Sequence, residues 1–119
     1  MSRTFRLGKL VRDGIVADME RMGQKPEHSV LPEADRIAAL QEKLLEESAE
    51  VDLPDLLEII EELAKSEGKT LDDIRREQLA KRDKIGGFSA GSFVTTVTLE
   101  DTDEWVEYYR AEPDRYPEA

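Results

Sequence analysis

Five carboxylates lie within ten residues of this sequence, at Glu46, Glu47, Glu50, Asp52 and Asp55. When residues 37–51 are read as a helix, Glu47 falls in the apolar stripe that contains Leu44 and Val51. A carboxylate that faces a core is costly unless it is paired or bound to a cation. Two carboxylates about 4 Å apart also repel each other by about 4 kcal/mol at an effective dielectric constant of about 20. Because a divalent cation removes both costs, this spacing predicts a metal site.

Mg²⁺ is the cation that this all-oxygen set favours, because it binds carboxylates and substrate phosphates together. Mn²⁺ shares the preference for carboxylate oxygen and is a second candidate. The alternative interpretation is that these acids form a solvated face of an acidic protein.

The composition narrows the classes of function. The chain has 119 residues, no cysteine and a formal charge of −11, so we expect one domain over residues 1–119 without disulfides or thiolate metal sites. Such a charge repels nucleic acid polymers and anionic membranes. The sequence has no long apolar run and no signal peptide, which favours a cytoplasmic protein. A single histidine, His28, cannot form a histidine metal site.

Basic residues at two places have two interpretations. Arg3, Arg6, Lys9 and Arg12 make the N-terminus the most basic segment of the chain. They form either a solvated terminus or an arm that contacts phosphate. Lys43 lies four residues before Glu47, where it forms either an intrahelical ion pair or a phosphate contact beside a metal.

The hydrophobic periodicity predicts an all-α fold. Helices are expected over residues 14–22, 31–51, 52–66 and 70–84, the last starting at a capping box made by Thr70 and Asp73. Residues 93–99 are β-prone and predict a short strand. The aromatic tail after residue 105 is expected to be turn-rich and to pack on the domain or on a partner subunit.

Four motifs resemble those of the MazG-type nucleotide pyrophosphohydrolases, in their phosphoribosyl-ATP pyrophosphohydrolase-like branch. KLVRD at residues 9–13 resembles the N-terminal signature, and KLLEESAE at 43–50 resembles the first metal helix. DLLEII at 55–60 resembles the second metal helix, and Arg82 with GGF at 86–88 resembles the C-terminal motif. The resemblance covers most of residues 7–98.

This resemblance implies a four-helix bundle, with the β-prone segment at its C-terminal side, that is dimeric or higher. Mg²⁺ would lie between two helices. The reaction would cleave nucleoside triphosphates to the monophosphate and pyrophosphate, and its role in the cell would be to clear non-standard nucleotides. The implied metal ligands are Glu47, Glu50, Asp52 and Asp55. Glu46 would act with Glu47 in catalysis as an acid near the metal, and the residues facing phosphate would be Lys9, Arg12, Lys43 and Arg82.

The sequence departs from the family pattern in three places. Asp52 stands where the family has Glu, and Gly14 stands where it usually has Lys. Only Val51 separates Glu50 from Asp52, whereas family members have a longer loop there. Because one residue is not expected to turn the chain with both acid sets facing each other, we hypothesise that a loop is missing from this stretch, together with the usual Glu.

Three functions remain open at this point. The first is a Mg²⁺-dependent nucleoside triphosphate pyrophosphohydrolase. The second is a catalytically degenerate helical bundle that serves as an interaction module. The third is a phosphohydrolase on the same bundle that acts on phosphoribosyl-ATP itself.

Overall fold

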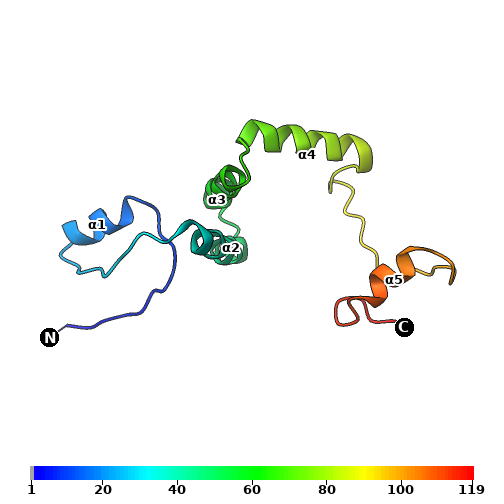
Figure 1. Ribbon diagram of the computed structural model, residues 1–119, viewed down its shortest axis with the longest axis horizontal. Helices are drawn as coiled ribbons and strands as arrows, with labels where there is room; N and C mark the ends of the chain where they lie inside the picture. Colours follow the sequence, from blue (N-terminus) through cyan, green and yellow to red (C-terminus); the bar gives the residue numbers. More distant parts are fainter. Residues whose placement is uncertain (1) are drawn as a thin grey trace. The chain divides into compact units, whose positions relative to one another are not determined.

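The computed structural model describes residues 2–119 and is helical. It contains α1 (Ile15–Arg21), α2 (Glu33–Glu50), α3 (Leu53–Ser66), α4 (Leu71–Ile85) and α5 (Trp105–Arg110) (Figure 1). The four predicted helices are confirmed. By its internal contacts the chain divides into two units, Met1–Ile85 and Gly86–Ala119, and the four predicted helices all belong to the first.

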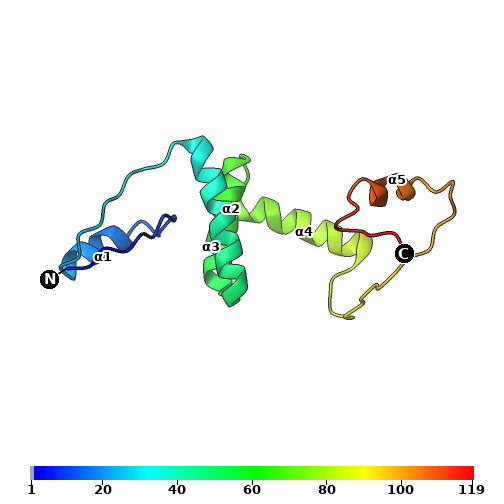
Figure 2. The same cartoon turned by 90° about the horizontal axis from the view of Figure 1, so that it is seen from below.

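Helices α2 and α3 form a hairpin and lie side by side (Figure 2). Their contact buries Leu40 of α2 together with Ile59 and Ala64 of α3. These three are the buried apolar residues of the described chain, so the hairpin holds its core. Helix α4 contacts α3 across a short turn. It begins at the predicted capping box, in which Thr70 Oγ1 accepts from the Asp73 N–H at 3.1 Å.

The turn between α2 and α3 uses two residues, Val51 and Asp52. Val51 adopts the left-handed conformation, with φ 54° and ψ 40°. The N–H of Asp52 donates to the carbonyl of Glu47 at 3.1 Å, and that of Val51 donates to Ser48 at 3.2 Å. This is the bond pattern of a Schellman motif, which ends a helix and reverses the chain. Asp52 then caps α3, because its Oδ1 accepts from the N–H of Asp55 at 3.2 Å.

Our expectation that so short a link cannot turn the chain is therefore wrong. We had assigned Asp52 to the second helix, so that Val51 was the one residue available for the turn. In the structure Asp52 lies outside both helices as the cap of α3, and the left-handed Val51 supplies the reversal. No additional loop is needed to bring the two helices together.

Val51 is expected to strain this turn. A β-branched residue in the left-handed region costs about 1–2 kcal/mol, and glycine avoids that cost while losing more backbone entropy on folding. We expect Val51→Gly to raise the free energy of unfolding by about 1 kcal/mol in urea denaturation. Val51→Ala is the matched control, because it shortens the side chain but keeps the Cβ atom. An equal gain in both variants would show that the left-handed conformation is not the cause.

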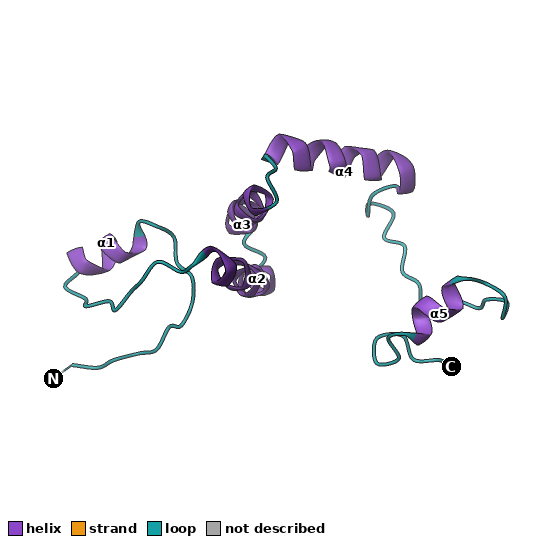
Figure 3. Cartoon of the chain, in the orientation of Figure 1, coloured by secondary structure: helices purple, strands orange, loops and turns teal. Residues whose placement is uncertain are grey.

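The prediction of a strand over residues 93–99 is wrong. No strand forms between residues 2 and 119 (Figure 3). A β-prone segment needs a partner strand to satisfy its backbone hydrogen bonds, and none pairs with it within the described residues. The tail is turn-rich as expected, and between its turns it also contains the fifth helix, α5. Its aromatic rings pack on one another, with Trp105 and Tyr108 in an edge-to-face pair at 5.0 Å.

Candidate metal centre

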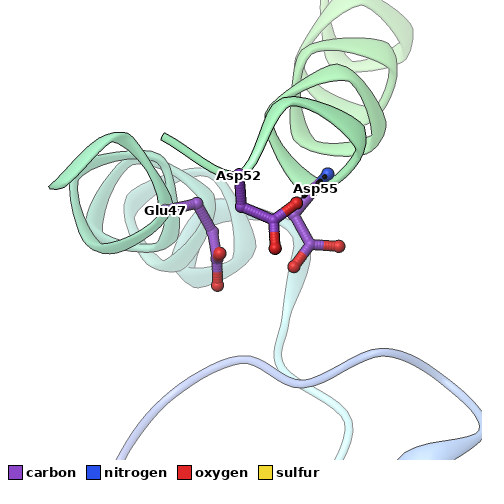
Figure 4. A group of neighbouring side chains, drawn as sticks. All are labelled: Glu47, Asp52 and Asp55. Atoms are coloured by element: carbon purple, nitrogen blue, oxygen red, sulfur yellow. Dashed lines mark hydrogen bonds between the residues drawn. The ribbon is translucent and has the colours of Figure 1, made fainter. Parts of the chain in front are cut away.

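Three carboxylates meet at the α2–α3 turn. Glu47 comes from the last turn of α2, and Asp52 and Asp55 come from the start of α3 (Figure 4). One carboxylate oxygen from each of them lies within 4.8 Å of the others. Glu47 is buried at 5% exposure, whereas the two aspartates are partly exposed. We call Glu47, Asp52 and Asp55 the acidic triad.

The Schellman turn is what assembles the acidic triad. Glu47 supplies the carbonyl that accepts from Asp52 N–H, so these two residues are fixed next to each other. Asp52 is the N-cap of α3, and Asp55 lies one turn further on the same side. Both aspartates lie where the positive end of the helix dipole favours negative charge. The short link, which we expected to disrupt the site, therefore builds it.

The donor set fits a hard divalent cation. All three groups offer carboxylate oxygen, the ligand that Mg²⁺ and Mn²⁺ prefer. In octahedral Mg²⁺ coordination, with metal–oxygen distances of about 2.1 Å, adjacent oxygens lie about 3 Å apart and opposite oxygens about 4 Å apart. The oxygens of the triad lie within 4.8 Å of one another, so side-chain rotations would bring them to ligand distance.

Basic side chains surround the acidic triad. Lys43 of α2 lies 3.3 Å from Glu47 and 3.5 Å from Glu46. The Nζ of Lys9 donates to Glu46 at 2.8 Å. Arg12 donates from both Nε, at 3.1 Å, and Nη2 to the same oxygen of Asp55. Lys43 thus forms the intrahelical ion pair that was one of its two interpretations. Lys9 and Arg12 of the N-terminal segment form ion pairs with acids at the site.

These contacts shift the pKa values of the groups involved. The hydrogen bond from Lys9 lowers the pKa of Glu46, and Glu46 raises the pKa of Lys9 in return. The hydrogen bond from Arg12 lowers the pKa of Asp55, and the same bond raises the pKa of the guanidinium. At neutral pH all four groups are therefore charged.

The Glu46 contact predicts a pH dependence of stability. The pKa of Glu46 lies below its ordinary value of 4.5 in the folded chain, so the folded state favours the carboxylate. This stabilisation is complete above pH 4.5 and is lost as the pH falls through the lowered pKa. The free energy of unfolding of the parent chain should fall between neutral pH and about pH 3, as measured by urea denaturation. In Glu46→Gln we expect that fall to be smaller. Glu42→Gln, an exposed change on the same helix, should leave that fall as in the parent chain.

Two predicted site residues lie outside the acidic triad. Glu50 is exposed in the last turn of α2 and does not belong to the group. Arg82 is exposed near the end of α4 and takes part in no salt bridge within residues 2–119. Their roles as metal ligand and phosphate contact stay predictions. The pairing of Arg12 with Asp55 was not predicted, because sequence spacing does not indicate which acid an arm more than forty residues away will contact.

No protein family model, curated protein or solved structure matches this chain. Within residues 2–119 no helix is long and apolar enough to cross a membrane. The molecular features that bear on function are therefore the acidic triad, the cations around it and the four sequence motifs.

Proposed function

We propose that this protein is a Mg²⁺-dependent nucleoside triphosphate pyrophosphohydrolase that releases the monophosphate and pyrophosphate. The observation that carries the proposal is the acidic triad, in which the buried Glu47 lies beside Asp52 and Asp55. A buried acid near two others is costly, and a bound divalent cation would offset that cost together with the ion pair from Lys43. The resemblance of the four motifs supports the same reaction.

In this proposal each group at the turn has a distinct task. Glu47, Asp52 and Asp55 hold the cation, which when bound neutralises phosphate charge and lowers the pKa of an attacking water. Lys9, Arg12 and Lys43 supply positive charge within reach of the triad, where they stabilise the negative charge of the phosphates. Glu46, beside Lys9 and Lys43, is placed to accept a hydrogen bond from water and orient it.

A small phosphate-bearing substrate fits the charge of the chain better than a polymer. The formal charge of −11 repels nucleic acid, whereas a divalent cation bound at the triad, together with Lys9, Arg12 and Lys43, would supply local positive charge for a single triphosphate. Clearance of non-standard nucleotides is the cellular role that we propose for such an activity.

The second candidate is a helical interaction module without catalysis. One observation favours it: every acid of the triad already has a protein partner. Lys43 pairs with Glu47, Arg12 pairs with Asp55, and Asp52 accepts from the N–H that it caps. In this case the acids would need no metal.

Thermal stability in Mg²⁺ distinguishes the two candidates. A cation that binds only the folded chain at 100 times its dissociation constant adds about 2.7 kcal/mol. For a domain of this size that should raise the melting temperature by about 10 °C. We expect this rise in MgCl₂ relative to NaCl at matched ionic strength, and expect Glu47→Gln to abolish it. An equal melting temperature in both salts would favour the interaction module.

We also propose that the protein is a homodimer or a higher homo-oligomer. The hairpin leaves large apolar side chains exposed, among them Leu45 at 71% and Leu57 at 55%. Exposed apolar side chains that gather on one face mark a protein–protein interface. Sedimentation equilibrium should give a mass at least twice the chain mass of 13.5 kDa. The double variant Leu45→Glu with Leu57→Glu, which adds charge at the interface, should lower the measured mass. A single-chain mass at all concentrations would contradict the proposal.

A further inference from the structure

The N-terminal arm, residues 2–14, is tied to the hairpin by two side chains. Lys9 donates to Glu46 and Arg12 donates to Asp55. Within residues 2–119 these are the hydrogen bonds that join the arm to α2 and α3, and the arm contributes no backbone bond to either helix. Most arm side chains are exposed, including Phe5 at 75%. Apart from Leu10 and Val11, which are half-buried, the arm is therefore held on the hairpin by two exposed ion pairs.

Arg12 binds a member of the acidic triad. Both its Nε and its Nη2 donate to Oδ1 of Asp55, an oxygen of one of the three carboxylates that would hold a cation. The ribbon of the arm, pale blue in Figure 4, passes beside the triad. A guanidinium and a divalent cation both neutralise a carboxylate, and they repel each other when close. The contact thus puts a protein cation where a metal ion would compete with it.

We propose that the arm is a latch that a divalent cation opens. This inference rests on the proposed function and concerns the regulation of the same site. With the cation absent, Arg12 neutralises Asp55 and holds the arm on the hairpin. When a divalent cation binds the triad, Arg12 leaves Asp55, and the arm is then held by Lys9 alone.

The latch couples metal binding to the supply of positive charge for the substrate. Once released, Arg12 has a free guanidinium fork, which suits phosphate oxygens. The site would therefore offer Arg12 to a triphosphate only after the cation is in place. Thermodynamic linkage makes this coupling reciprocal. The docked arm weakens cation binding by some factor, and a bound cation weakens docking of the arm by the same factor.

Arg12→Gln gives the first test, by isothermal titration with MgCl₂. Since exposed ion pairs contribute modestly, we expect the variant to bind Mg²⁺ about two- to fivefold more tightly than the parent chain. Arg6→Gln is the matched control: it removes one charge from the same arm, and Arg6 forms no ion pair within the described residues. We expect Arg6→Gln to change the affinity much less. A role of Arg12 in holding the metal site together predicts the opposite sign, with weaker binding in Arg12→Gln.

Arm mobility gives the second test, independent of activity. The chain has no cysteine, so Leu7→Cys creates a single site for a spin label on an exposed position of the arm. We expect the electron paramagnetic resonance spectrum to sharpen in MgCl₂ but not in NaCl at matched ionic strength. Arg12→Gln should give the sharp spectrum without Mg²⁺.

The outcomes separate this inference from the proposed function. Mg²⁺ binding with an unchanged label spectrum, or weaker binding in Arg12→Gln, would overturn the latch and leave the proposed function standing. Mg²⁺ binding that releases the arm without any pyrophosphate release would support the latch and overturn the proposed function. An absence of Mg²⁺ binding would overturn both.

Discussion

Replacing Glu47 with Gln is expected to lower Mg²⁺-dependent pyrophosphate release by at least about 100-fold. Outer groups that only orient metal ligands typically cost about 10- to 100-fold when removed, and Glu47 would be a ligand itself. The amide keeps the size of the side chain but removes the charge that the cation requires. Glu47 is also the buried member of the triad, so water replaces its carboxylate less readily than it would that of Asp52 or Asp55.

Glu42→Gln is the matched control for this variant. Glu42 lies on the same helix, is exposed and forms no ion pair within residues 2–119, so the same chemical change there should leave pyrophosphate release at the parent level. Pyrophosphate should be measured at saturating substrate over a range of MgCl₂ concentrations. Equal rates in the two variants would show that the triad does not carry the reaction.

Ile59→Ala is expected to have the largest effect on stability. Ile59 is 6% exposed and lies in a core whose other buried apolar residues are Leu40 and Ala64. Removing a buried isoleucine side chain to Cβ costs about 2–4 kcal/mol from lost transfer energy and the cavity left behind. Domains have only about 5–15 kcal/mol of stability, so this loss is a large part of the total. Because the hairpin holds Glu47 against the start of α3, the Mg²⁺-dependent rise in melting temperature should shrink as well.

Urea denaturation checks this prediction, with Ile85→Ala as its control. Ile85 has the same side chain but is 74% exposed at the end of α4, so its truncation should change the free energy of unfolding by less than about 0.5 kcal/mol. Similar losses in the two variants would mean that the α2–α3 contact does not supply the core.

Residues close in sequence allowed the helices and the centre of the site to be predicted. Glu47 lies in the apolar stripe of its helix, and the structure buries it. The periodic runs of α2, α3 and α4 and the capping box at Thr70 follow from local rules, so their bounds agree with the structure to within one or two residues. In these segments the local backbone preference and the period of the hydrophobic residues both favour a helix.

Other features depend on conformations or contacts that the pattern does not contain. The α2–α3 turn requires a positive φ at Val51, which is unusual for a β-branched residue, so the pattern suggested a missing loop instead. The β-prone run at residues 93–99 lacked a partner strand, and α5 is too short to give a clear period. The ion pair of Arg12 with Asp55 joins distant parts of the chain through two exposed side chains, for which sequence spacing carries no signal.

Product analysis tests the proposed pyrophosphohydrolase activity directly. The purified protein is incubated with nucleoside triphosphates, including non-standard ones, and with phosphoribosyl-ATP, each with and without Mg²⁺, and the phosphate products are separated. We expect nucleoside monophosphate and pyrophosphate in equal amounts, only with Mg²⁺, and neither with Glu47→Gln. Turnover of phosphoribosyl-ATP alone would assign the same chemistry to a different substrate. Diphosphate with inorganic phosphate, or no product across the whole panel, would show that the protein does not catalyse the proposed reaction.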